Sequence, residues 1–483
     1  MKNHLYIVLI VFAFIFASCR EETLSSDPSL RLAFSQDSIW FDTVFTNMGS
    51  ATQVMMVYNP NRNAVKISSV TTQTDYFQLN LDGENDPNRL HDITINGKDS
   101  LYLFVRVYIP EQTENTPVLI ADTIRFLTNG NEQMIPLQAY GQNVHLIHSK
   151  EQCQTFDVPF VFSNDKPYLI FDTLVFHRKA VIAEGATLYV HSGISLLFHG
   201  GLAARGTKDN PIRITSDRLD RLFTHVPYQV ASGGWGGIYL LQPKQTALHN
   251  DTLNYTDILS GNVGLYAYSE QTDQLPSLTV ANCRIHNHAT YGIIVQNTDA
   301  HIYNTEISNC ASYCLYLDGG KQTLTHNTIA SFFGWPNTNI NIHNVTRDNV
   351  AAVYINNLSK QNQPTEVQMR NCIVTGARDN NLVVATPLAG YYTGEFSGNY
   401  LRADTINAPW CHDNTYARDS DTVFVNTYYM YREYHYYDFR LDSVSPARGI
   451  GLKEVLQDPQ YATDRLGNSR PLTEQPDAGC YQY

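Results

Sequence analysis

Three ionisable side chains recur at one position of a repeating pattern in the second half of the chain. Asp257, Arg284 and Glu306 each directly precede an isoleucine, as does Thr328 one repeat later. Two carboxylates on one face could serve as the acid and base of a glycosidase, and inverting enzymes hold these groups about 6.5–9.5 Å apart. Asp257, Arg284 and Glu306 are therefore the candidate catalytic residues.

The isoleucines that follow these residues set the period of the pattern. Ile285, Ile307, Ile329 and Ile373 are separated by 22, 22 and 44 residues. Short alternating apolar stretches lie at fixed distances from these markers, and such units cannot bury their apolar side alone, so they must stack on one another. We expect a parallel β-solenoid with the four isoleucines in one interior column. The other apolar positions in register are Val280, Ile302 and Leu324 before the markers, and Ile293, Val295, Leu315 and Leu317 after them.

The stacking fixes the expected geometry of the candidate residues. Neighbouring coils lie about 4.8 Å apart, so Asp257 and Glu306 should lie roughly 9–10 Å apart with Arg284 between them, all facing outward. That distance only touches the range for an inverting glycosidase. A surface row of ion pairs explains the same residues without any chemistry, and we favour this interpretation, although exposed pairs add little stability.

Several motifs resemble right-handed parallel β-helix proteins of the pectate-lyase-like superfamily, over roughly residues 150 to 483. The resemblance implies the fold but little about activity, because the superfamily includes lyases, hydrolases, adhesins and inert scaffolds. Its lyases use carboxylates on calcium with an arginine base, and an arginine between the two acids makes a shared calcium site awkward. We expect no cofactor and no metal site, with calcium only if the chain is such a lyase. The motifs include Asn282-Cys283-Arg284-Ile285, Gly292-Ile293-Ile294-Val295, Asn304-Thr305-Glu306-Ile307 and Trp235-Gly236-Gly237-Ile238.

The N-terminal residues resemble an export signal. Lys2 precedes an apolar run from Leu5 to Ala17, which is shorter than the roughly 20 residues of a membrane-spanning helix and is typical of a signal peptide over 1–18. Phe16-Ala17-Ser18-Cys19 resembles a bacterial lipobox, which implies lipidation of Cys19 and an outer-membrane anchor. Arg20-Glu21-Glu22 resembles the export tag of Bacteroidota surface lipoproteins, while a solvated tether explains it equally well.

Pattern changes divide the mature chain. A lipidated cysteine and tether occupy 19–31, and alternating strands without the repeat over 32–143 predict a β-sandwich that resembles Ig-like spacer domains. The β-helix follows over 150–437, and 438–483 resembles the terminal region of β-helix proteins, expected to cap the last coil because open ends expose unpaired strand groups. The predicted fold class is all-β.

Charge and aromatic content limit the partners. Lys and Arg number 33 against 46 Asp and Glu, a net charge of −13, which argues against nucleic acid. The 31 tyrosines offer rings and hydroxyls that suit sugars. Phe333, Trp335 and Tyr436 lie in the densest aromatic clusters and are candidate ligand-binding residues, the alternative being that they pack a cap and a loop.

Cysteine use points to structure rather than chemistry. Cys283 lies two residues before a marker isoleucine and should face inward as a small apolar side chain. Cys310 and Cys314 could bridge across a turn in an oxidising compartment, while metal binding lacks histidines at suitable spacing.

The sequence leaves three functions open. The favoured hypothesis is a lipid-anchored, non-catalytic envelope protein that binds an extracellular glycan or an envelope protein. The second is a polysaccharide lyase or glycoside hydrolase that uses Asp257, Arg284 and Glu306. The third is an architectural spacer.

Overall fold

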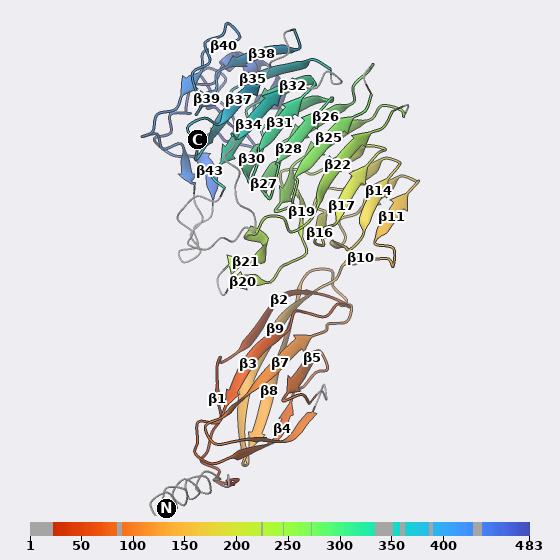
Figure 1. Cartoon of the computed structure of the whole chain (residues 1–483), viewed down its shortest axis with the longest axis vertical. Helices are drawn as coiled ribbons and strands as arrows, with labels where there is room; N and C mark the ends of the chain where they lie inside the picture. Colours follow the sequence, from red (N-terminus) through yellow and green to blue (C-terminus); the bar gives the residue numbers. More distant parts are fainter. Residues whose placement is uncertain are drawn as a thin grey trace, which may run out of the picture. The chain divides into compact units, whose positions relative to one another are not determined.

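The computed structural model describes residues 23–84, 89–223, 226–244, 246–271, 273–333, 351–357, 363–385, 390–427 and 437–483. The chain is all-β, as predicted, and divides after Asn143 into two compact units (Figure 1). The predicted signal peptide over 1–18 and Cys19 lie outside the described residues. Within the described ranges, no helix is long and apolar enough to span a bilayer.

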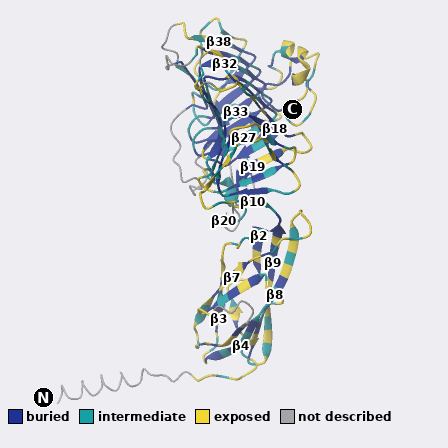
Figure 2. Cartoon of the chain, turned by 90° about the vertical axis from the view of Figure 1, so that its right-hand side faces the viewer, coloured by how far each residue is buried: buried dark blue, intermediate teal, exposed yellow. Residues whose placement is uncertain are grey.

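The first unit is a β-sandwich, which confirms the fold predicted for this part of the chain. Its strands alternate between buried and exposed side chains (Figure 2), and the two inner faces form one core that includes Met55, Phe77 and Phe126. One sheet has the order β1 (Ala33–Phe34), β3 (Gln53–Tyr58), β7 (Ser100–Val107), β5 (Phe77–Leu81), and the other has the order β2 (Ile39–Phe45), β9 (Asn131–Gln142), β8 (Val118–Thr128), β4 (Val65–Thr71), β6 (Arg89–Ile95).

The predicted tether over 19–31 is docked in its described part. Leu24 forms a bridge with Ala64, and the Ser25 amide donates to the Ala64 carbonyl at 2.9 Å. The Asn129 side chain donates to the carbonyls of Ser25 and Asp27. From Leu24 onward, the chain is therefore held against the sandwich rather than forming a free linker.

The second unit is a parallel β-helix built from three sheets, with successive coils contributing one strand to each. The first sheet carries the marker isoleucines and the second carries a row of tyrosines. The first sheet contains β10 (His145–Ile147), β13 (Tyr168–Ile170), β16 (Thr187–Val190), β19 (Ile212–Ser216), β24 (Thr256–Leu259), β27 (Arg284–His288), β30 (Glu306–Cys310), β33 (Thr328–Ser331), β36 (Ile373–Gly376), β39 (Tyr400–Leu401) and β41 (Thr415–Tyr416).

The other two sheets complete each coil. The second sheet contains β11 (Cys153–Phe156), β14 (Thr173–Phe176), β17 (Ser195–Phe198), β22 (Gly237–Gln242), β25 (Leu265–Ser269), β28 (Ile293–Gln296), β31 (Leu315–Asp318), β34 (Val353–Asn356) and β37 (Leu382–Ala385). The third contains β12 (Phe160–Phe162), β15 (Ala180–Ile182), β18 (Leu202–Arg205), β23 (Asn250–Asn254), β26 (Ser277–Ala281), β29 (Asp299–Tyr303), β32 (Gly320–Thr325), β35 (Thr365–Arg370), β38 (Tyr392–Ser397) and β40 (Cys411–His412).

The marker isoleucines form an interior column with one exception. Ile258 pairs with Ile285, and Ile307 and Ile329 continue the same row, all fully buried. Ile373 instead pairs with Thr328 and faces outward, while Val374 pairs with Ile329, so the predicted fourth member of the column is wrong by one residue.

A turn residue explains this shift. Asn282, Asn304 and Asn371 all adopt positive φ, a conformation that asparagine tolerates better than most residues. In the first two cases the inward residue lies three positions later, at Ile285 and Ile307. Three positions after Asn371 is Val374, so the turn sets the register and the spacing between isoleucines does not.

The C-terminal segment (residues 438–483) lies along the side of the coils, although the sequence predicts an end cap. Two of its hydrogen bonds reach adjacent coils: the Gly479 amide donates to the carbonyl of Asn371, in the turn before β36, and the Cys480 amide donates to Oγ1 of Thr328 on β33. Trp410 instead packs at the end of the helix, 5.2 Å from Phe396 between ring centroids. The remaining elements are β20 (Arg221–Phe223), β21 (Val226–Pro227), η1 (Tyr228–Val230), β42 (Phe424–Asn426), β43 (Asp438–Leu441), η2 (Lys453–Gln457) and η3 (Pro459–Tyr461).

Candidate functional site

The candidate catalytic residues share one row of the first sheet, as their spacing predicts. Asp257 pairs with Arg284 and Arg284 with Glu306 on adjacent strands, and Thr328 follows. The row faces away from the helix interior, but Glu306 is only 2% exposed. The predicted surface row is therefore an internal interface.

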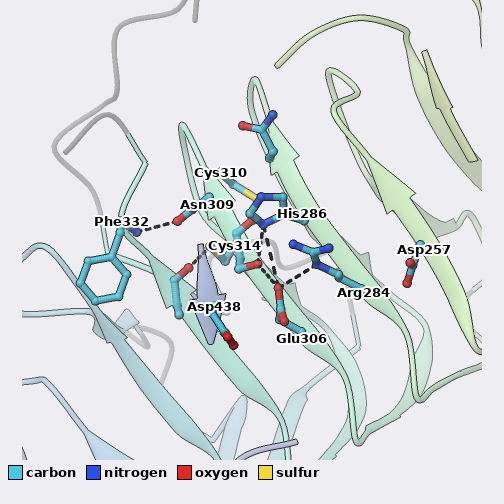
Figure 3. Close-up of polar contacts among 12 residues, drawn as sticks. Asp257, Arg284, His286, Glu306, Asn309, Cys310, Cys314, Phe332 and Asp438 are labelled. Atoms are coloured by element: carbon cyan, nitrogen blue, oxygen red, sulfur yellow. Dashed lines mark hydrogen bonds and ion pairs between the residues drawn. The ribbon is translucent and has the colours of Figure 1, made fainter. Parts of the chain in front are cut away.

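Glu306 is the centre of a buried charge network (Figure 3). Arg284 Nε donates to Glu306 Oε1 at 3.2 Å, and Ser308 Oγ donates to the same oxygen at 2.7 Å. The Tyr481 hydroxyl, from the C-terminal segment, donates to Glu306 Oε2. Burial alone would raise the pKa of Glu306, but the positive charge of Arg284, with further help from His286 and the tyrosine, lowers that pKa to about 2.

Asp257 belongs to the same interface through another residue of the C-terminal segment. Arg465 Nη2 donates to Asp257 Oδ1 at 2.7 Å, and Arg465 Nε donates to the Cys283 carbonyl at 3.2 Å. Asp257 and Glu306 are therefore each held by a different arginine. The network joins the C-terminal segment to the first sheet and leaves Glu306 ionised at neutral pH, so this carboxyl has no proton to donate as a general acid.

The neighbouring histidines point to opposite sides of the same strand. His286 lies outside, with Nδ1 2.8 Å from Ser308 Oγ, whereas His288 is fully buried and its Nε2 lies 3.2 Å from the Ile258 carbonyl. Burial lowers the pKa of His288 to about 4. Among the described residues, no three His, Cys, Asp or Glu side chains are grouped in a way that could hold a metal ion.

The cysteines of this region are buried inside the helix. Cys283 is fully buried, as predicted, and burial raises the pKa of its thiol to about 12. The Cys310 thiol lies 3.7 Å from the Ser308 carbonyl, and the Cys314 thiol lies 3.9 Å from the Ala330 carbonyl. Both thiols contact backbone rather than forming the disulfide considered from the sequence.

The predicted aromatic ligand sites do not offer a ring to solvent where they are described. Phe333 is 2% exposed. Its neighbour Phe332 lies 6.1 Å from Phe439 between ring centroids, with the ring planes 25° apart, and so packs under the C-terminal segment. Trp335 and Tyr436 lie outside the described residues.

A different aromatic row lies on the second sheet. Tyr239 pairs with Tyr266, Tyr266 with Ile294, Ile294 with Tyr316, and Tyr316 with Tyr354, one residue per coil. These residues alternate with buried inward positions and are partly exposed. We call the four tyrosines Tyr239, Tyr266, Tyr316 and Tyr354 the tyrosine face.

Neighbouring rings of this face are in contact. The Tyr316 and Tyr354 centroids lie 5.8 Å apart with planes 4° from parallel, and the Tyr239 and Tyr266 centroids also lie 5.8 Å apart. The ring centroid of Tyr313, from the turn before β31, lies 4.8 Å from that of Tyr354. The contacts hold the rings in a fixed arrangement, which reduces the entropy that a ligand would otherwise have to remove.

A row of polar side chains runs beside the tyrosine face, in which Gln296 is partly exposed while Asp318 and Asn356 are buried. Gln296, Asp318 and Asn356 pair in sequence on β28, β31 and β34. The Tyr266 hydroxyl donates to Gln296 Oε1 at 2.7 Å, and Asn356 Nδ2 donates to the Tyr316 hydroxyl at 2.9 Å. Partial burial raises the pKa of both tyrosines, so they stay neutral well above physiological pH.

Sequence reasoning missed this face, although the repeat contained its signal. The alternation places Leu315 and Leu317 inside, so Tyr316 between them must face outward. The same reasoning applies to Tyr266, between Leu265 and Ala267. Aromatic density along the chain favours local clusters, whereas a row across coils contributes one residue per repeat.

Comparisons with known proteins find a family match within the second unit. The family described as "Right handed beta helix region" matches residues 232–406, which is less than half of the chain. No curated protein matches.

Solved structures give faint similarities. They include a protein of unknown function from Porphyromonas gingivalis (14% identity, 26% of this chain, 50% of that chain, TM-score 0.17) and the E. coli chaperone DraB (10% identity, 24% of this chain, 55% of that chain, TM-score 0.17). A third is an ASH/PapD-like domain of human CEP192 (10% identity, 26% of this chain, 94% of that chain, TM-score 0.17). The chain spans about half the length of the first two, and at these TM-scores none bears on function. What the comparisons do identify is a right-handed β-helix region within the second unit.

Proposed function

We propose that this chain is a lipid-anchored protein of the cell envelope that binds an extracellular glycan on its tyrosine face. The observation that carries the proposal is the row of four partly exposed tyrosines in register on β22, β25, β31 and β34. Tyrosine suits sugars because its ring packs against the apolar side of a pyranose while its hydroxyl bonds polar groups. The lipobox-like residues ending in Cys19 support the anchor.

The buried network favours binding over hydrolysis or elimination. Glu306 is ionised, paired with Arg284 and covered by Tyr481, so a sugar cannot approach its carboxyl. Among the described residues of the two outward rows between β22 and β34, Asp318 is the only carboxylate. A glycosidase of the usual kind requires two.

The test is a binding assay on the full-length protein in a detergent without a sugar headgroup. The protein is screened against a panel of extracellular polysaccharides, and the best ligand is titrated against the wild type and a Tyr316→Ala, Tyr354→Ala double variant. Each ring contact contributes about 0.5–1.5 kcal/mol, so we expect the double variant to bind roughly ten-fold more weakly. A Tyr102→Ala variant of the sandwich, whose ring is 57% exposed, is the matched control and should bind normally.

Three results would overturn the proposal. The first is glycan binding that both tyrosine substitutions leave unchanged. The second is the release of unsaturated or reducing ends from the polysaccharide, which would favour the lyase or hydrolase. Binding of an envelope protein in place of any glycan would also reject the glycan as the ligand.

The anchor is tested separately. Metabolic labelling with a palmitate analogue should mark the wild-type protein, and Cys19→Ser should abolish the label and release the protein from membranes. A variant that still carries the label would reject lipidation at Cys19.

A further inference from the structure

We infer that the ligand of the tyrosine face is an uncharged, linear glycan that lies along the axis of the β-helix with about one sugar residue per coil. This inference rests on the proposed function and specifies the ligand class. It follows from the charge of the face, from its direction, and from one interruption in the row.

The face lacks positive charge. None of the ten described residues that alternate with the core positions of its strands is Lys or Arg. Eight of them are partly exposed, namely Tyr239, Leu241, Tyr266, Tyr268, Ile294, Gln296, Tyr316 and Tyr354, while Asp318 and Asn356 are buried. Proteins bind the carboxylates or sulfates of acidic polysaccharides with arginine and lysine. Here the one carboxylate, Asp318, is only 4% exposed, so the exposed part of the face is uncharged, and the whole chain carries a net charge of −13, which disfavours an anion. A neutral glycan meets no such cost.

The register gives the direction. Successive rings lie on successive coils, which are about 4.8 Å apart, a rise close to the length of one sugar residue in an extended chain. A glycan along the axis therefore meets a new ring at each coil. A glycan across the sheet would meet two outward positions per strand, such as Tyr266 and Tyr268, and then leave the face.

One adjoining amide, Gln296, is partly exposed and can supply a matching polar contact. Gln296 accepts the Tyr266 hydroxyl through its amide oxygen, and its NH2 group carries two donors suited to sugar hydroxyls. Asn356 lies two coils further along the same row, but it is only 7% exposed, so it orients the Tyr316 hydroxyl rather than contacting a ligand itself. A row of rings with an amide beside it suits a pyranose, which presents an apolar side and polar hydroxyls.

Ile294 interrupts the row of rings and so provides a direct test. It occupies the outward position between Tyr266 and Tyr316, where the other coils from β22 to β34 carry tyrosine. A ring at this position would connect the two pairs, Tyr239 with Tyr266 and Tyr316 with Tyr354. Because the side chain faces outward and is partly exposed, the larger residue need not enter the core.

The experiment titrates the full-length protein with two series of linear oligosaccharides from two to six residues. One series is neutral (β-glucans, xylans and mannans), and the other is anionic (oligogalacturonates). We expect the affinity for one neutral series to rise with length up to about five residues, the number of coils from β22 to β34. We expect the anionic series of equal length to bind at least ten-fold more weakly.

The Ile294→Tyr variant should bind the long neutral chains about three-fold more tightly, equivalent to one added ring contact, and should leave disaccharide affinity unchanged. Ile294→Leu is the matched control and should behave as wild type. Tyrosine-dependent binding whose affinity does not change with the length of the oligosaccharide, or that favours the anionic series, would overturn this inference while leaving the proposed function intact. If no series binds in a way that depends on Tyr316, the proposed function fails as well.

Discussion

The same repeat builds two outward faces of the β-helix, of which one is covered by the C-terminal segment and the other is partly exposed. On the first sheet, Asp257, Arg284 and Glu306 lie under the C-terminal segment and are joined to Arg465 and Tyr481. On the second sheet, the tyrosine face stays partly exposed and its outward rows carry one described charge. The conspicuous charges are thus structural, and the tyrosine face, whose one carboxylate is only 4% exposed, is the face for which we propose a ligand.

The largest loss of stability is expected from a substitution in the covered face of the first sheet. Arg284→Leu leaves the carboxylate of Glu306 buried without its arginine, which costs about 3–5 kcal/mol of stability. Chemical denaturation of the second unit measures this loss. The matched control is Arg125→Leu in the exposed Arg125–Glu132 pair, where we expect less than about 1 kcal/mol. Equal effects in the two variants would show that the network is not buried in solution.

The second effect is the dependence of stability on pH. The folded pKa of Glu306 is about 2, below the ordinary value of 4.5, so its ionised form stabilises the fold above pH 4.5 and this contribution disappears as the pH falls toward 2. The shift corresponds to about 3 kcal/mol. In a Glu306→Gln variant, the loss of stability between pH 5 and 2 should be correspondingly smaller. Identical pH profiles for variant and wild type would contradict this assignment.

The third effect concerns the hydrogen bond from the C-terminal segment. Tyr481→Phe keeps the ring and removes the hydroxyl that donates to Glu306, which should cost about 1.5–3 kcal/mol because the acceptor is charged. Thermal unfolding provides the measurement. Tyr437→Phe is a control in the same region. If it lowered the thermal stability as much as Tyr481→Phe does, the hydrogen bond from Tyr481 to Glu306 would have no special role.

The smallest expected effect on stability belongs to the open face. Tyr316→Ala should change the unfolding free energy by about 1 kcal/mol or less, since the ring is partly exposed, while clearly weakening glycan binding. Denaturation and titration of one preparation separate these quantities. A large loss of stability would mean that the tyrosine face, like the first sheet, is structural.

The local pattern predicted the coils but not what covers them. The period placed Ile285, Ile307 and Ile329 correctly because alternation fixes which side chains face inward. It misplaced Ile373, since the register depends on the positive-φ turn at Asn371. Alternation also shows that Glu306 faces out of the coil, but not that another segment covers it.

That cover depends on contacts between distant parts of the chain. Arg465 and Asp257 are 208 residues apart, and Tyr481 and Glu306 are 175 apart. No periodic signal connects such residues, so the ionisable row resembled a surface feature. The tyrosine row, in contrast, was present in the repeat and could have been found by comparing the outward positions of successive coils.

Hydroxyl-radical footprinting with mass spectrometry tests the contrast between the two faces most directly. The four residues of the tyrosine face should be oxidised readily in the free protein and protected by a saturating neutral glycan. Tyr481, which is 6% exposed, should remain unmodified under both conditions. Oxidation of Tyr481 at the rate of the tyrosine face, or no protection of that face by any glycan, would contradict the account.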